Sequence, residues 1–141
     1  MRYSRAVDHT VYDDWLSGFL AEMGGQAGTV HVTRGDSLEL RAAVNIPPPV
    51  VELTRMIPRG KGMAGLALQR RAPVQTCDLK TDETGDVRPG ARAVDAKAAV
   101  ALPVTDGAGD IRAVVGIAFA ESRDLDDAEI AKLSAAANRL P

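Results

Sequence analysis

Apolar side chains recur every four residues near the start of the chain: Val7, Val11, Trp15, Phe19 and Met23, with Leu16 and Leu20 widening the stripe. This spacing predicts an amphipathic helix over about residues 7–24. Gly24 and Gly25 come next, and glycine is favoured just past the end of a helix. A helix therefore opens the predicted fold.

A second amphipathic pattern lies at the other end of the chain. Asp126 stands three residues before Glu129, which is the pattern of a capping box at the start of a helix. One apolar face then follows, formed by Ile130, Leu133, Ala137 and Leu140. We therefore predict a C-terminal helix over about residues 126–140.

Two pairs of short apolar runs lie between these helices. Residues 29–33 and 38–46 are predicted strands that flank a turn containing Gly35. Residues 98–105 and 111–120 are the most apolar runs, and the glycine-containing segment 106–110 joins them as a hairpin. Hairpins pair their strands antiparallel, so we expect an antiparallel sheet.

The middle of the chain mixes short elements. A helix is expected from Val50 up to Pro58 and another over residues 63–70, and residues 73–77 read as a short extended piece. Residues 80–97 form the longest polar loop. The predicted order is α-β-β-α-α-β-β-β-α, which places the fold in the α+β class.

Composition narrows the class of protein. The chain has 141 residues, 45% of them hydrophobic, which suits one folded domain over residues 1–141. Its formal net charge of -2 gives no broad basic footprint, so no nucleic-acid partner is expected. One cysteine, Cys77, excludes an internal disulfide, and no apolar run reaches membrane-spanning length. We expect a cytoplasmic domain with no membrane partner.

Gly60, Gly62 and Gly65 spell G-x-G-x-x-G, and Asp78 follows the extended piece downstream. This is the outline of a dinucleotide-binding fingerprint. That motif needs a buried strand leading into the first glycine and parallel βαβ units, whereas Gly60 here follows the end of a predicted helix. The alternative is structural: the glycines form tight turns and let a short helix approach the sheet closely.

The same stretch resembles the core of a GAF domain. The resemblance rests on Ile-Pro-Arg-Gly-Lys-Gly-Met-Ala-Gly-Leu-Ala (57–67), Ala-Pro-Val-Gln-Thr-Cys-Asp (72–78), Ala-Leu-Pro-Val (101–104) and Val-Val-Gly-Ile-Ala (114–118). It implies a GAF-like (PAS/profilin-like) antiparallel sheet with the N- and C-terminal helices on one face. Short helices and loops would cover a ligand pocket on the other face, as in a signalling or sensory module.

The resemblance also bears on catalysis. The free methionine-(R)-sulfoxide reductases of this fold carry a cysteine in a Gly-x-Gly-Val-Cys-Gly segment, where this chain has Ala64. Cys77 alone cannot form the internal disulfide of that cycle. His9 is expected to be solvated and His31 to be half-buried in the sheet, with a heme or metal ligand as the alternative for His31. We predict no enzyme activity, no catalytic residue and no metal site.

No cofactor is predicted either. Cys77 has no histidine beside it, and few aromatic residues are present to line a bilin pocket, so Cys77 is read as a small buried hydrophobe. The Asn-Lys pair of the cyclic-nucleotide-binding members does not occur in the sequence.

The GAF resemblance implies candidate residues for an unidentified small-molecule ligand: Met63, Cys77, Asp78, Arg88, Arg92, Val100 and Phe119. Arg88 and Arg92 belong to the loop expected to roof the pocket, where an arginine can pair with a carboxylate or phosphate. Met63, Val100 and Phe119 would form part of its floor, together with Leu66, Leu102 and Ile117.

These floor residues would serve equally well as plain core, and a filled pocket would leave no ligand. The second predicted function is therefore a protein-interaction module that forms a homodimer through its terminal helices. Phe19 and Leu20 with Leu133 and Leu140 are the apolar candidates for that contact.

Overall fold

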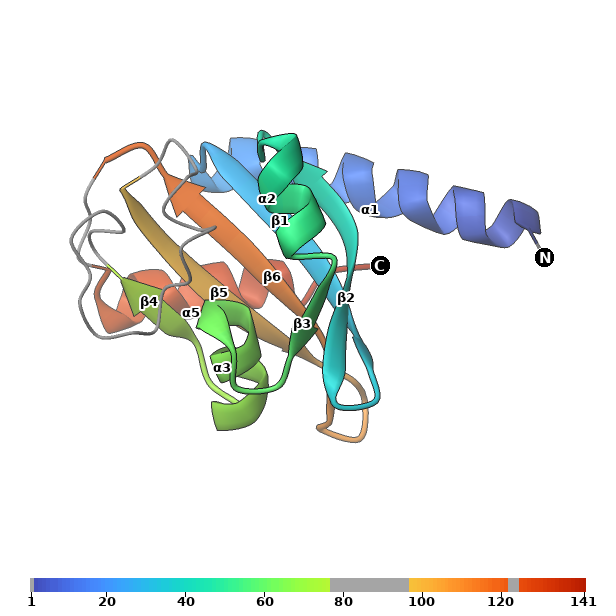
Figure 1. Cartoon of the computed structure of the whole chain (residues 1–141). Coiled ribbons are helices and arrows are strands. Elements are labelled where there is room, and N and C mark those ends of the chain that lie inside the picture. The colour runs from blue at the N-terminus through green and yellow to red at the C-terminus, as the bar shows by residue number, and fades with distance from the viewer. Residues whose placement is uncertain (1, 77–96, 122–124) are drawn as a thin grey trace.

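The computed structural model describes residues 2–76, 97–121 and 125–141, with side chains described from residue 11 onward (Figure 1). Its helices are α1 (Arg2–Met23), α2 (Pro48–Leu53), α3 (Gly62–Arg70) and α5 (Asp127–Ala137). Its strands are β1 (Ala27–Arg34), β2 (Ser37–Val44), β3 (Met56–Pro58), β4 (Val74–Thr76), β5 (Ala98–Thr105) and β6 (Ile111–Phe119). The α+β class predicted from the sequence is confirmed.

The strands form one six-stranded antiparallel sheet in the order β3-β2-β1-β6-β5-β4. The two predicted hairpins, β1–β2 and β5–β6, lie side by side, and β1 pairs with β6 to join them. Gly35 takes a φ of +62° in the turn between β1 and β2, a conformation that glycine adopts without steric cost. β1 and β6 therefore occupy the centre of the sheet.

Helices α1 and α5 cover one face of this sheet (Figure 1). Leu16, Phe19 and Leu20 of α1 and Leu133 of α5 are buried in one cluster with alternate side chains of the central strands. Trp15 stacks on Phe19 with ring centroids 5.0 Å apart. Burying each leucine or phenylalanine contributes about 1.5–3 kcal/mol, so this cluster holds both terminal helices on the sheet.

Helices α2 and α3 lie over the opposite face (Figure 1). Leu68 of α3 packs in a cluster with Leu38 of β2 and Val114 of β6. Val50 of α2 packs in a second cluster with small side chains of β1 and β6. The sheet is thus covered on both faces, as the sequence resemblance implied.

The predicted N-terminal cap of the last helix is confirmed. The carboxylate of Asp126 accepts a hydrogen bond from the backbone N–H of Glu129 at 2.8 Å. This bond satisfies one of the free N–H groups in the first turn of α5. Leu125, directly before the cap, is buried in the same cluster as the apolar face of α5.

The predicted helix from Val50 up to Pro58 is wrong at its C-terminal end. α2 ends at Leu53, and residues 56–58 form strand β3, which pairs with β2. Ile57 is buried whereas Met56 is exposed, because neighbouring residues of a strand point to opposite faces. The helical spacing of Val50, Leu53 and Ile57 is therefore a coincidence: Val50 and Ile57 are buried from two different elements, and Leu53 is 60% exposed.

The structural interpretation of the glycine motif is confirmed. Gly60 and Gly62 have φ values of +84° and +66° in the turn between β3 and α3. A Cβ added to Gly65 would lie 2.5 Å from the carbonyl oxygen of Pro58, so only glycine lets α3 approach this turn. The pairing throughout the sheet is antiparallel, so the motif does not stand in the parallel βαβ unit that a dinucleotide fold requires.

We predict that Gly65→Ala destabilises the protein by about 1–3 kcal/mol, because the new methyl group would overlap backbone atoms that cannot rotate away. Urea unfolding followed by circular dichroism measures this change. Gly18→Ala is the matched control, since a Cβ at this position in α1 meets nothing within 4 Å. The control should be neutral or more stable by up to about 1 kcal/mol. Equal stability of Gly65→Ala and the wild type would contradict the close approach.

Candidate functional site

The sheet face beneath α2 and α3 has unusually small side chains over its central strands. We call these residues the small-residue floor: Ala27, Thr29, Ala43, Ala99, Gly116 and Ala118. Strand pairing aligns them, with Thr29 between Ala43 and Gly116 in one row and Ala118 between Ala27 and Ala99 in the next. Thr29, Ala43, Ala99 and Gly116 remain partly exposed.

Apolar side chains from the covering segments border the floor. Val50 of α2 and Ile46 pack with Ala27 and Ala118. Met63, in the first turn of α3, contacts this cluster as well as the cluster beneath α3. Methionine is flexible and fills irregular gaps, so this side chain is suited to adjust at the edge of a binding face.

The candidates named from sequence divide into three groups. Met63 lies on the face of the floor. Val100 and Phe119 lie on the opposite face, buried in the cluster with α1 and α5. Cys77, Asp78, Arg88 and Arg92 lie outside the described residues.

The prediction that Met63, Val100 and Phe119 share one pocket floor is wrong, because the sheet separates them. Alternate residues of a strand point to opposite faces. In β5, Val100 and Leu102 face the terminal helices, so Ala99 faces the floor. Ile117 and Phe119 of β6 face the same helices as Val100, while Gly116 and Ala118 face the floor.

His31 of β1 was expected to be half-buried, yet it is only 2% exposed. It follows Thr29 by two positions and therefore shares the face of the floor. Its Nε2 lies 2.8 Å from the carbonyl oxygen of Thr54, at the C-terminal end of α2. A carbonyl only accepts, so Nε2 carries the hydrogen and Nδ1 is left as an acceptor. Within the described part of the chain, Nδ1 has no hydrogen-bond partner.

Sequence reasoning had one signal for this residue. His31 stands between Val30 and Val32 in a strand with turns at both ends. A histidine in the middle of a strand covered on both faces is buried. The covering of both sheet faces, which the family resemblance implies, is therefore the signal that points to a buried His31.

Burial lowers the pKa of His31 below its ordinary value of 6.5, and the hydrogen bond to the Thr54 carbonyl opposes this shift only in part. The imidazole is therefore neutral at physiological pH, with a fixed tautomer and an available lone pair on Nδ1. A neutral acceptor of this kind binds hydrogen-bond donors and repels the oxygens of an anion.

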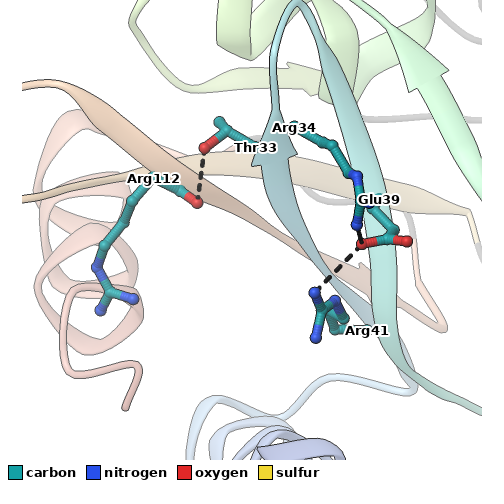
Figure 2. Close-up of polar contacts among 5 residues, drawn as sticks. All are labelled: Thr33, Arg34, Glu39, Arg41 and Arg112. Atoms are coloured by element: carbon teal, nitrogen blue, oxygen red, sulfur yellow. Dashed lines mark hydrogen bonds and ion pairs between the residues drawn. The ribbon is translucent and has the colours of Figure 1, made fainter. Parts of the chain in front are cut away.

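Three charged residues at the β1–β2 hairpin form ion pairs on the surface (Figure 2). The Glu39 carboxylate lies 3.0 Å from the guanidinium of Arg34 and 3.2 Å from that of Arg41. Desolvation raises the pKa of Glu39, but the two arginines outweigh it and hold the pKa below its usual value. Figure 2 shows Arg112 pointing away from this group, and its guanidinium donates to the carbonyls of Leu140 and Pro141. These contacts stabilise the surface and the end of α5.

Within the described residues, no group of three or more His, Cys, Asp or Glu side chains is placed to hold a metal ion. No helix in the same part of the chain combines the length and the apolar character needed to span a membrane.

A family model described as the GAF domain matches residues 9–140, nearly the whole chain. The chain belongs to the GAF domain family. The resemblance seen in the sequence is thereby confirmed, together with the sheet and the arrangement of its helices. GAF domains generally sense small ligands or regulate other proteins. A comparison with curated proteins finds no match to this chain.

Solved structures agree on the fold. The type II free methionine-R-sulfoxide reductase from Thermoplasma acidophilum is 16% identical with a TM-score of 0.75, covering 96% of this chain and 91% of its own. The GAF domain of the Acinetobacter phosphoenolpyruvate-protein phosphotransferase has 16% identity, a TM-score of 0.74 and coverages of 94% and 79%. A GAF domain/HD domain protein from Geobacter sulfurreducens is 14% identical with a TM-score of 0.73, and the match covers 94% of this chain and 88% of that protein. Identities this low establish the fold alone.

The lowered pKa of His31 predicts how stability depends on pH. As pH falls below 6.5, the unfolded chain takes up a proton that the folded chain excludes, so the free energy of unfolding decreases by at most about 1.4 kcal/mol per pH unit. Above this window His31 contributes no slope. Urea unfolding between pH 5 and pH 8 measures the effect.

His31→Gln is the matched variant for this measurement. Its amide keeps an N–H near the Thr54 carbonyl but does not titrate, and the two proteins are otherwise identical. The stability of the wild type relative to His31→Gln should therefore rise from pH 5 to pH 7 and level off above it. Parallel pH profiles would show that His31 is not protected from protonation.

Proposed function

We propose that this GAF domain binds a small molecule against the small-residue floor and acts as a sensory or regulatory domain without catalysis. The observation that carries the proposal is the partly exposed row of Ala43, Thr29 and Gly116 on the face covered by α2 and α3. These small side chains extend only a short way from the backbone, which would leave room for a flat ligand between the sheet and the helices. Family membership supports a ligand on this face.

The proposal excludes reductase chemistry in spite of the Thermoplasma acidophilum neighbour. Ala64, at the position of the family's thiol, is a residue of α3 that packs against the cluster beneath that helix. A methyl group neither attacks a sulfoxide nor forms a disulfide. Cys77 is the one thiol in the sequence, and a second one would be needed to resolve an oxidised intermediate.

Contacts at the ends of the strands support a route for a signal. Arg112 of β6 binds the carbonyls of Leu140 and Pro141, beyond the end of α5. Asn138 accepts a hydrogen bond from the backbone N–H of Thr105 at the end of β5. β6 also carries Gly116 of the floor, so one strand connects the proposed ligand face to the C-terminal end of α5.

We predict that a thermal-shift screen of small metabolites at neutral pH gives at least one compound that raises the melting temperature further as its concentration increases. Ala99→Leu should reduce that shift, because the larger side chain fills the floor. Ala108→Leu is the matched control: it makes the same change at an exposed position in the turn between β5 and β6. The control should keep the shift.

Two outcomes would contradict this function. No stabilising compound, together with a solved structure whose core is filled over the floor, would eliminate ligand binding. Turnover of free methionine-(R)-sulfoxide that is lost in Cys77→Ser would eliminate the non-catalytic assignment. We expect no turnover in this assay.

A homodimer is the second candidate function, and α1 carries it. The apolar residues named from sequence for this contact, Phe19, Leu20, Leu133 and Leu140, are buried in the domain's own core and are not available to a partner. The N-terminal part of α1 instead extends past the edge of the sheet (Figure 1). Val11, on this helix, is 38% exposed.

We predict that light scattering detects a concentration-dependent dimer and that Val11→Arg shifts it to monomer, because a charge would be placed in the helix contact. Leu53→Arg is the control, since Leu53 is also an exposed apolar residue but lies on α2, over the opposite face. A strict monomer at high concentration, or an equal effect of both variants, would exclude this contact.

A further inference from the structure

The Nδ1 atom of His31 is a buried acceptor without a hydrogen-bond partner in the described part of the chain. A buried acceptor without a partner destabilises a protein, so such groups are rare and mark a water, an ion or a bound ligand. His31 meets this description within the described residues: it is 2% exposed, and only its Nε2 is bonded.

The position of His31 connects it to the small-residue floor. Thr29 precedes His31 by two residues on β1. Val114, the cross-strand partner of His31 on β6, is two residues from Gly116, the partner of Thr29. The imidazole therefore stands in the row next to the one formed by Thr29 and Gly116. Gly116 carries no side chain, and the hydroxyl oxygen of Thr29 lies 2.8 Å from where its Cβ would stand.

We propose that Nδ1 of His31 accepts a hydrogen bond from an N–H or O–H group of an uncharged, compact ligand seated on the small-residue floor. This inference rests on the proposed function and gives it a ligand class. The Thr54 carbonyl fixes the hydrogen on Nε2, so the free nitrogen can only accept. An amide, a hydroxyl group or a ring N–H satisfies it, and a carboxylate or phosphate placed there would not.

The same histidine would carry the binding event to α2. Thr54 is the C-terminal cap of this helix, where its backbone N–H bonds the carbonyls of Val50 and Val51 and its hydroxyl donates to Val50. A ligand on Nδ1 polarises the ring and strengthens the Nε2–H bond to the Thr54 carbonyl. Val50 in turn packs over Ala27 and Ala118 of the floor.

The test uses the whole chain labelled with ¹⁵N-histidine and matched pairs of small probes. Pyrazole, indazole and benzamide carry an N–H donor, whereas 1-methylpyrazole, 1-methylindazole and N,N-dimethylbenzamide have methyl groups in place of the N–H hydrogens. Compounds found in the thermal-shift screen are added to the donor set. Ring-nitrogen spectra during titration report whether Nδ1 accepts a hydrogen bond, and His9→Gln identifies the other histidine signal.

The expected result has three parts. The free protein shows His31 with hydrogen on Nε2, and at least one donor compound shifts the Nδ1 signal. Its methylated counterpart binds about tenfold more weakly or worse, as loss of one hydrogen bond predicts. His31→Gln weakens the donor compound by a similar factor, and His9→Gln does not.

The failure modes separate this inference from the proposed function. Binding that leaves the Nδ1 signal unmoved, or that is equal for donor and methylated probes, overturns the role of His31 while ligand binding stands. No binding by any probe or metabolite overturns both. If His31→Gln does not fold, the wild-type ring signal and the methylated pairs still decide.

Discussion

Burial of the central strands on both faces is the constraint on which the rest of this structure depends. β1, β5 and β6 lie between two layers of helices, and their successive side chains point alternately to each layer. Large residues such as Val30, Val115 and Ile117 face α1 and α5 and form the main core. Thr29, Gly116 and Ala118 face the other way. The first face is thus packed throughout, whereas the second combines a packed cluster beneath α3 with the small-residue floor.

Much of this fold follows from the sequence because its signals are local. The four-residue spacing around Trp15 and Phe19 identifies α1, and the Asp126 cap identifies the start of α5. Each hairpin combines two apolar runs with a turn of glycine and aspartate. Strand β3 was missed because three residues are too few to show a period, and its pairing with β2 is a tertiary contact. The β1–β6 pairing, which joins distant parts of the chain, has no local signal either.

The candidate site was harder to predict because it depends on which face of the sheet each strand residue points to. Apolar character selected Val100 and Phe119, but a shift of one residue along a strand exchanges one face for the other. The floor is made of alanine, glycine and one threonine, and these residues form no pattern that marks a ligand site in a sequence. The family motif identified the fold correctly, since Gly65 is required by the close approach of α3. That steric role makes the motif independent of any ligand.

The two candidate functions use opposite faces of one sheet. They can be coupled because both layers of helices pack on the same strands. A ligand would lie beside α2 and α3, and a dimer would form through α1 on the other side. Any effect of one on the other must pass through the strands, because the sheet separates the two layers. β6 is placed for this, with Gly116 on the floor and Arg112 bound to the carbonyls beyond α5. Arg139 then links the end of α5 to Glu22 of α1 at 3.0 Å. Exposed ion pairs are weak, so the transmitted force would come mainly from the buried core beneath both helices.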